Sequence, residues 1–242
     1  MRLAILLAFI SVNWGLNAQS PDSVEKKTTA KKFIVKNLAV PVALVGLGLY
    51  TKDQGSLMNR FDVRDWRNNH YPRFSHHADD VLQFVPIGLV YGLDLIKVKS
   101  KNDLLNRTLI LAKSEVLMAI IVRSLKTSTH VLRPDRSNYH SFPSGHTAQA
   151  FVAATFMHKE LGYKSVWFSI GAYTIASGVG AFRILNNKHW VSDVLAGAGF
   201  AVLSTNLAYA THRYKWGKRP NWVAVPTYSN GPGIYVSYRF RE

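Results

Sequence analysis

The sequence predicts an all-α fold: a membrane-embedded bundle of six helices, followed by a small β-hairpin at the C-terminus. Six apolar stretches follow one another along the chain, and the last two are long, almost free of charge and rich in small residues. Small residues let helices approach closely in lipid. The stretches are Phe33–Tyr50, Val81–Ile96, Thr108–Leu125, Thr147–His158, Val166–Ile184 and Val191–Ala210.

The segments outside these stretches predict the order of the chain's parts. Residues 1–18 have the pattern of a signal peptide, with a positive start, a short apolar run and Ala18 at the cleavage position. Residues 19–32 are polar and rich in Lys and Thr, which predicts a linker. The helical domain is then expected over residues 33–219 and a C-terminal tail over residues 220–242.

The centre of the predicted bundle is partly polar, because the third stretch contains Lys113, Glu115 and Arg123. Ionisable groups at that depth must face the bundle interior or water. Between the first two stretches, Leu57–Asp80 mixes aromatic residues with arginines. This segment is expected either to lie on the membrane surface or to pack on the bundle as an amphipathic loop. In the tail, Ser229–Gly233 is a turn signal followed by β-favouring residues, which predicts the hairpin.

The chain is strongly basic, with 30 Lys and Arg against 14 Asp and Glu and a formal charge of +16. Such a charge favours anionic lipid headgroups or phosphorylated substrates, although basic loops beside membrane helices explain it equally well. The cations do not form one face, so no nucleic-acid partner is expected. There is no cysteine, which excludes disulfides, thiolate zinc sites and cysteine nucleophiles.

Lys126 and Arg133 form the first of three clusters with chemical interest, and Pro134 closes the run. If the run is helical, a spacing of seven places both cations on one face. The guanidinium of Arg matches phosphate oxygens as a planar fork, and Lys adds a point charge. Taken alone, the cluster is more typical of basic residues that cap a membrane helix.

The second cluster is Pro143-Ser144-Gly145-His146, which precedes the fourth apolar stretch. Ser144 and Gly145 offer a hydroxyl and free backbone N–H groups at a helix N-terminus, where anions bind well. His146 is then placed to protonate a leaving oxygen. A plain helix start with a chance histidine is the alternative.

The third cluster is Arg183, His189 and Asp193. Asn186-Asn187 predicts a turn after Arg183, so that His189 opens the last helix. Asp193 then shares a helical face with His189 and accepts a hydrogen bond from its imidazole, which leaves the other ring nitrogen free to attack. A helix-surface His–Asp pair without a catalytic role is the alternative.

The three clusters together, Lys-x6-Arg-Pro, Pro-Ser-Gly-His and Arg-x5-His-x3-Asp, resemble the type 2 phosphatidic acid phosphatase (PAP2) superfamily. That family includes bacterial acid phosphatases and vanadium haloperoxidases. The resemblance covers Lys126 to Asp193, and the layout of apolar stretches extends it from Phe33 to Ala210. It implies a helical bundle of PAP2 type with phosphatase activity.

By this resemblance, His189 is a nucleophile that forms a phosphohistidine, Asp193 holds it, and His146 is the general acid. The phosphate-binding residues are then Lys126, Arg133, Ser144, Gly145 and Arg183. Three cations suit a transition state with charge spread over equatorial oxygens, so neither a metal nor another cofactor is expected. Phe182 is a departure, because the family usually has Ser before this Arg, and a hydroxyl contact is lost.

Loop charges predict the orientation in the membrane. Basic residues follow the second, fourth and sixth stretches; if all six span, these regions share the cytoplasmic side and both catalytic loops face the periplasm. A cleaved signal peptide conflicts with this, because six spans from a periplasmic N-terminus put the site in the cytoplasm. Either the signal is not processed or one stretch does not cross, and Phe33–Tyr50 is the better candidate to lie flat.

An export signal favours a lipid of the bacterial envelope, with the inner membrane as the location. The expected partners are therefore the bilayer and an anionic phospholipid or lipid A. The basic, signal-bearing form most resembles lipid A phosphatases of the 4′-phosphatase type; undecaprenyl diphosphate and phosphatidylglycerol phosphate are alternative substrates. Transfer to an acceptor lipid in place of water stays open. A vanadium haloperoxidase and a non-catalytic lipid-binding protein are the rival functions.

Overall fold

A computed structural model describes residues 23–52, 59–214, 222–227 and 233–238 of the chain. By its internal contacts the chain divides into two compact units, Met1–Lys36 and Asn37–Glu242. The site and its supporting helices belong to the second unit. The predicted signal peptide, residues 1–18, lies outside the described residues.

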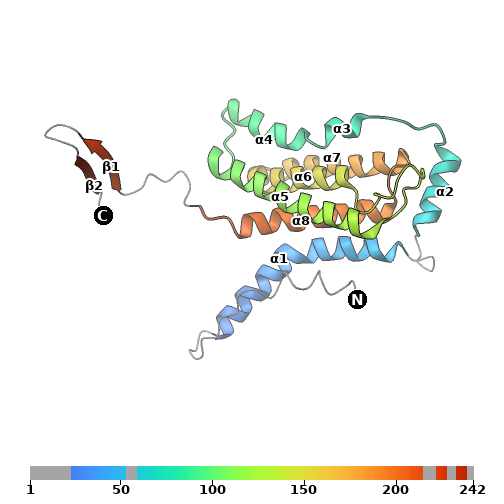
Figure 1. Ribbon diagram of the computed structural model, residues 1–242, viewed down its shortest axis with the longest axis horizontal. Helices are drawn as coiled ribbons and strands as arrows, with labels where there is room; N and C mark the ends of the chain where they lie inside the picture. The colour runs from blue at the N-terminus through green and yellow to red at the C-terminus, as the bar shows by residue number, and fades with distance from the viewer. Residues whose placement is uncertain (1–22, 53–58, 215–221, 228–232, 239–242) are drawn as a thin grey trace. The chain divides into compact units, whose positions relative to one another are not determined.

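The described residues form eight helices and one two-stranded sheet, which confirms the all-α class and the C-terminal hairpin (Figure 1). Five of the six apolar stretches each lie in one helix, whereas Val81–Ile96 covers the end of α3, the break at Gln83–Phe84 and all of α4. The short helix α2 and the separate helix α3 were not predicted. The helices are α1 (Ser23–Tyr50), α2 (Arg60–His70), α3 (Ala78–Leu82), α4 (Val85–Leu95), α5 (Leu104–Thr129), α6 (Gly145–Leu161), α7 (Val166–Leu185) and α8 (Val191–Ala210).

Helix α1 begins earlier than the sequence predicts. The pattern predicts a polar linker over residues 19–32, whereas the structure has helix from Ser23 onward. Lys, which is frequent in this segment, is a good helix former, so polarity alone is a poor indicator of a linker.

Helix α6 is the centre of the bundle, and it packs against α4, α5, α7 and α8. Its alanines and Phe156 are fully buried, together with Ala176 and Val179 of α7. Small side chains on α6 let several helices lie close around it (Figure 1). The buried core therefore runs along α6, whose N-terminus carries the second cluster.

Glycines bring α8 close to its neighbours. A Cβ on Gly199 would lie 2.7 Å from Val45 of α1, and one on Gly48 would lie 2.9 Å from the Ser192 carbonyl oxygen. The Asn206 side chain also donates to the Asn37 carbonyl over 2.9 Å. The C-terminal half of α1 thus fixes the position of α8, which carries Asp193.

The described part of the segment before α4 packs on the bundle, as the second of the two expectations for Leu57–Asp80 has it, but it contains the helix α2 and the start of α3 where a loop was expected. Helix α2 begins after Asn59, whose side chain accepts hydrogen bonds from the first-turn amides. The buried Arg67 of α2 donates to the Leu185 carbonyl over 2.7 Å, which ties α2 to the end of α7.

The C-terminal hairpin consists of β1 (Trp222–Thr227) and β2 (Gly233–Tyr238). The strands are antiparallel, with Trp222 opposite Tyr238 and Thr227 opposite Gly233. The connecting turn lies outside the described residues.

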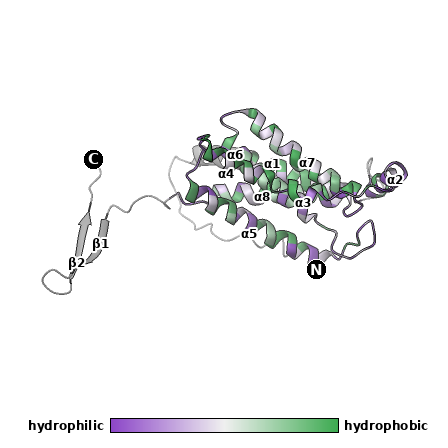
Figure 2. Cartoon of the chain, turned by 90° about the horizontal axis from the view of Figure 1, so that it is seen from above, coloured by the Kyte–Doolittle hydropathy of each residue, from purple (hydrophilic) through white to green (hydrophobic). Residues whose placement is uncertain are grey.

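Two described helices, α7 and α8, are long and apolar enough to cross a membrane. They differ in their surroundings, since 72% of the apolar window of α8 is buried but only 28% of that of α7. Large apolar side chains are exposed on α1, α4, α5 and α7, such as Val42, Ile120 and Trp167. Figure 2 shows apolar residues over the long helices and hydrophilic ones gathered on α2.

Candidate active site

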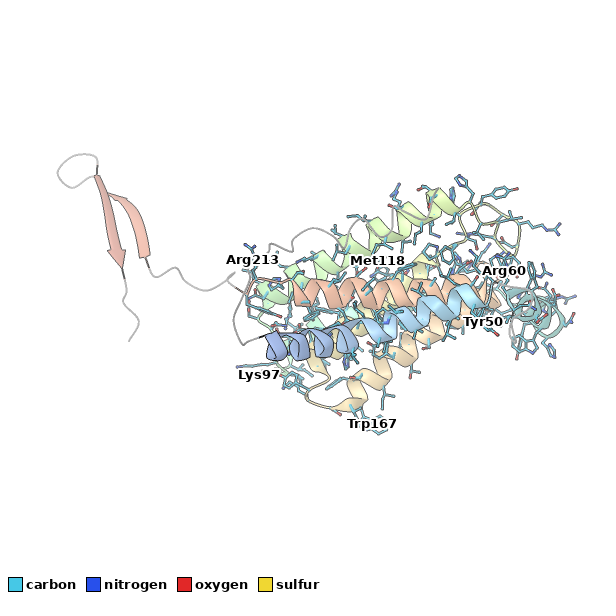
Figure 3. All side chains as sticks on the ribbon, turned by 90° about the horizontal axis from the view of Figure 1, so that it is seen from below. Tyr50, Arg60, Lys97, Met118, Trp167 and Arg213 are labelled. Atoms are coloured by element: carbon cyan, nitrogen blue, oxygen red, sulfur yellow. The ribbon has the colours of Figure 1, made fainter. Side chains whose placement is uncertain are left out.

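The three clusters meet at one end of the bundle. This end is formed by the C-terminus of α5, the N-terminus of α6 and the turn between α7 and α8. Figure 3 shows Tyr50 and Arg60 at this end, with Lys97 and Arg213 at the opposite end.

The turn between α7 and α8 places Arg183 and His189. Helix α7 ends at Leu185, and Asn187 has a φ of 58°, a left-handed conformation that Asn tolerates well. The Arg183 carbonyl accepts hydrogen bonds from the amides of Lys188 (3.0 Å) and His189 (3.3 Å). The predicted turn after Arg183 is therefore present.

The sequence predicts that His189 opens α8, but in the structure His189 lies just before the helix. Helix α8 begins at Val191, and its N-cap Trp190 is extended with φ −74° and ψ 157°. The His189 Nδ1 lies 3.6 Å from Asp193 Oδ2, which is longer than a hydrogen bond. Asp193 thus faces the ring, but the pair does not arise from a shared helical face.

Asp193 is fully buried and joins the second cluster to the third. Its carboxylate accepts hydrogen bonds from the Ser141 hydroxyl (2.5 Å) and the Trp190 amide (3.0 Å). Its main-chain carbonyl accepts one from the Ser144 amide over 3.0 Å. Gly197 makes this approach feasible, since a Cβ there would lie 2.6 Å from the Ser144 carbonyl oxygen.

The environment of His189 keeps its imidazole neutral. The side chain is 2% exposed, and burial is the main cause that lowers its pKa to about 4. Asp193 opposes this shift, whereas the positive charges of Lys126 and Arg133 add to it. A buried neutral imidazole keeps a free lone pair at neutral pH, which a nucleophile requires.

The second cluster begins α6. Ser144 is the N-cap of the helix, and its hydroxyl interacts with Thr147 Oγ1 over 2.9 Å. The amides of Gly145 and His146 belong to the first helical turn, where N–H groups have no acceptor within the helix. An anion at this N-terminus is favoured by these donors and by the helix dipole.

His146 is bound to a carboxylate that the sequence gave no reason to expect. Its Nε2 lies 2.8 Å from Asp80 Oδ1, and the Asp80 side chain is half exposed. Burial and the charge of Arg183 lower the pKa of His146, while Asp80 raises it. The hydrogen bond to His146 is also the main cause that lowers the pKa of the Asp80 carboxyl. Asp80 therefore helps His146 to hold a proton.

The first cluster is not one helical run. Helix α5 ends at Thr129, and its cap His130 has a φ of 46°, so Arg133 lies in the following loop. The prediction of a shared helical face is therefore wrong. Lys126 donates to the His140 carbonyl over 2.8 Å and lies beside Gly145, whose Cβ position is 4.0 Å from Lys126 Cε.

Arg183 is held by a buried ion pair. Its Nη1 lies 2.6 Å from Asp79 Oδ2, and Asp79 is 1% exposed. Asn186 donates to the His76 carbonyl over 2.7 Å and so fastens the segment before α3 to the end of α7. Asp79 is the second carboxylate that the sequence did not reveal, because 104 residues separate it from Arg183.

Asp79, Asp80 and His146 are a group whose ligand atoms lie within 4.8 Å of one another, as in some metal sites. All three side chains have partners, since Asp79 pairs with Arg183 and Asp80 pairs with His146. The arrangement is therefore accounted for by contacts within the protein.

Phe182 occupies the position where the related motif usually has Ser. Its ring lies 5.8 Å from the ring of Phe74 and 6.4 Å from that of His76, measured between centroids. It thus packs against the segment that carries Asp79 and Asp80, in place of a hydroxyl contact to phosphate.

Comparison with known proteins identifies relatives of this chain. Residues 107–217 match the family model of the PAP2 superfamily. The lipid A 1-phosphatase of Porphyromonas gingivalis is 38% identical over 149 residues, which are 61% of this chain and 34% of that protein. The chain thus corresponds to about a third of the length of that curated relative.

Two solved structures are also similar. The crystal structure of Aquifex aeolicus LpxE is 23% identical and covers 62% of this chain and 94% of its own, with a TM-score of 0.46. That of a transmembrane PAP2-type phosphatidylglycerolphosphate phosphatase from Bacillus subtilis is 21% identical, covers 70% and 94%, and has a TM-score of 0.44.

Proposed function

Because residues 107–217 match the family model of the PAP2 superfamily, we propose that this protein is a metal-independent lipid phosphatase that works through a phosphohistidine on His189. The observation that carries the proposal is the meeting of the three clusters at one end of the bundle. A phosphate monoester bound there meets a nucleophile, an acid and concentrated positive charge.

The nucleophile is the neutral imidazole of His189. Asp193 faces Nδ1, which leaves Nε2 to bond to phosphorus as the bond from phosphorus to the alcohol oxygen breaks. Positive charge develops on the ring in this step, and the buried carboxylate stabilises it. The hydrogen bonds from Ser141 and the Trp190 amide keep that carboxylate in place.

His146 supplies the proton that the leaving alcohol oxygen needs. Asp80 binds its Nε2, so Nδ1 is the nitrogen left for this exchange. In the second step His146 takes a proton from water, whose oxygen attacks the phosphohistidine. The products are the dephosphorylated lipid and inorganic phosphate, and His189 is regenerated.

The phosphate oxygens are held by cations and by a helix N-terminus. Lys126, Arg133 and Arg183 contribute positive charge, and the amides of Gly145 and His146 add donors. The pKa causes support this grouping, since Arg183 acts electrostatically on Arg133, and both Lys126 and Arg133 act on His189. Charge spread over three equatorial oxygens is stabilised without a metal.

Lipid A is the substrate that the comparison favours. The relative from Porphyromonas gingivalis is named for the 1-phosphate of lipid A. The sequence pattern by itself favoured the 4′-phosphate, and we now place the 1-phosphate first. Exposed apolar side chains on α1, α4, α5 and α7 support a bilayer around the bundle, which brings a lipid headgroup to the site.

We place the site on the periplasmic side of the inner membrane. Lys97 follows α4 and Arg213 follows α8, and both lie at the end of the bundle opposite to Arg60 (Figure 3). Basic loops favour the cytoplasmic side, which assigns the site to the other face.

The test is phosphate release by detergent-purified protein from lipid A, in the presence of a chelator. Chelator-resistant release, with a product mass lower by one phosphate, is expected, and fragmentation of the product identifies the 1- or 4′-position. Trapping at acidic pH should be avoided, because phosphohistidine is acid-labile, and alkaline quenching should retain labelled phosphate on the protein. If phosphate were released from other lipid phosphates but not from lipid A, the substrate assignment would be overturned, while the proposed chemistry would stand.

A further inference from the structure

A cavity of about 460 Å³ adjoins the candidate active site. It lies between the end of α1, the beginning of α2 and the loop after α5. Arg133 lines this cavity and is also one of the phosphate-binding residues of the site. Trp190, the neighbour of His189, forms another part of the wall.

The lining is strongly positive. Among the residues that the structure describes, the lining includes five cationic side chains and no Asp or Glu: the cations are Lys52, Arg60, Arg64, Arg133 and Arg136. Arg64 pairs with Asp65 over 2.7 Å. In the described part of the chain, the other four form no ion pair. Cations that converge without acidic partners are costly unless an anion joins them.

Aromatic rings hold two of these cations in position. The Arg60 guanidinium lies 4.8 Å from the Phe61 ring centroid and 5.1 Å from that of Trp190. Arg64 lies over the same two rings at 5.4 and 5.6 Å. Trp190 is itself fixed, because its indole N–H donates to the Leu132 carbonyl over 2.8 Å. The positive groups are therefore arranged before any ligand binds, which reduces the entropy that binding costs.

Two guanidinium nitrogens at the cavity have unused hydrogen-bonding capacity. The Nε atoms of Arg60 and Arg133 are buried, and neither has a hydrogen-bond partner among the described residues. Burial and, after it, the charge of Arg183 lower the pKa of Arg133, while Asp135 and Asp193 oppose this shift. An anion in the cavity that bound the other guanidinium nitrogens of both residues would offset their positive charge.

We propose that this cavity is a second anion-binding subsite, which takes a second phosphate group on the headgroup of the same lipid whose first phosphate reacts at His189. The inference rests on the proposed function and deepens it. Arg133 borders both sites, so the headgroup spans from one to the other across this residue. The volume is in the range of small-molecule pockets, roughly 300–1,000 Å³, so it accommodates part of a sugar headgroup together with the phosphate.

The experiment compares two forms of one lipid, with one or with two phosphate groups. The variant combines Arg60→Gln with Arg136→Gln, which removes two charges from the cavity and leaves Arg133 in place. The matched control combines Lys97→Gln with Arg213→Gln, the same change of charge at the opposite end of the bundle (Figure 3). The quantity measured is the ratio of kcat/KM for the two-phosphate lipid to that for the one-phosphate lipid.

We expect the ratio to fall by about tenfold or more in the Arg60/Arg136 variant, because each lost charged hydrogen bond weakens binding by about that factor. The control should keep the ratio of the unmutated protein. An unchanged ratio in the Arg60/Arg136 variant overturns the inference, as does an equal fall in the control.

The inference and the proposed function fail in different ways. If the unmutated protein releases no phosphate, the proposed function fails. The inference is then tested by the ratio of the affinities for vesicles that contain the two-phosphate lipid and for vesicles that contain the one-phosphate lipid. If the variant kept the ratio but lost binding of inorganic phosphate, the cavity would be a site for a free anion. This result would overturn the headgroup assignment.

Discussion

Buried charges at the two ends of the bundle differ in whether the protein supplies their partners. At the end with Lys97 and Arg213, Glu160 is fully buried and accepts hydrogen bonds from the Asn102 amide (2.9 Å), the Asn102 side chain (2.7 Å) and the Tyr209 hydroxyl (2.6 Å). At the other end, Lys126 and Arg133 form no ion pair among the described residues. Glu160 thus has its partners within the protein, whereas Lys126 and Arg133 are placed to bind an anion that the described residues do not supply.

This difference separates stability from function. A buried charge with several partners contributes to one defined structure, and removing it leaves those partners unsatisfied. A cluster of like charges opposes folding, and its presence is explained by what it binds. The predictions below test whether the two ends can be disturbed independently.

The largest effect is expected from His189→Ala. Loss of the nucleophile should reduce phosphate release by about 10⁴-fold or more, as for other enzymes that act through a covalent intermediate. The matched control is His158→Ala in the C-terminal part of α6, where the ring contacts Ser169 over 2.8 Å. Release should survive in this control. Comparable losses of phosphate release in both variants would contradict the assignment of catalysis to the end of the bundle that contains His189.

Lys126→Met should separate activity from stability most clearly. We expect phosphate release to fall by about 10²- to 10³-fold, because one electrostatic contact to the transition state is lost. The melting temperature should stay the same or rise, since a half-buried cation is replaced by an apolar side chain of similar length. A fall in melting temperature together with activity would show that Lys126 supports the fold.

Asp80→Asn should have a moderate effect that depends on pH. The Asp80 charge raises the pKa of His146, so its removal lowers that pKa and reduces the protonated fraction of the acid at neutral pH. We expect about a tenfold loss of kcat/KM at pH 7. The alkaline limb of the pH profile should move to lower pH, because the acid loses its proton sooner.

The acid limb serves as the internal control for Asp80→Asn. It reports loss of activity as His189 gains a proton near its pKa of about 4, and Asp80 is not among the groups that set this value. A profile whose two limbs move together would indicate a general change of the site.

The smallest effect on catalysis is expected from Glu160→Ala. Its removal leaves Asn102 and Tyr209 without acceptors, which should lower the free energy of unfolding by about 3 kcal/mol. Activity of the protein that remains folded should change by no more than about twofold, because the contact lies at the far end of α6. Denaturation in detergent and phosphate release measured on the same preparation test both parts.

The long helices could be predicted from the sequence because their apolar stretches are local patterns. The turn at Asn186-Asn187 was predicted for the same reason, since Asn tolerates a left-handed conformation. The predicted positions of Arg133 and His189 relative to helix ends were wrong. A spacing of four or seven residues places two side chains on one face only if the run between them is helical. In the structure, α5 ends before Arg133 and α8 begins after His189.

Asp79 and Asp80 could not be found from the sequence. They lie 104 and 66 residues from the side chains that they contact, and no local pattern marks a carboxylate as a future partner. Their segment has a mixed composition, which predicted either a region on the membrane surface or an amphipathic loop packed on the bundle. The packing of Phe182 against Phe74 offers one signal in retrospect, because an aromatic residue beside Arg183 needs an apolar neighbour.

The contact between Ser144 and Asp193 has a consequence for the order of events during synthesis. The Ser144 amide is fixed by the main chain of α8, the last of the described helices to be synthesised. The proposed anion-binding turn and the proposed nucleophile therefore come together only when that helix has docked. A chain arrested before α8 should be inert toward lipid phosphates, so the onset of activity marks the completion of insertion.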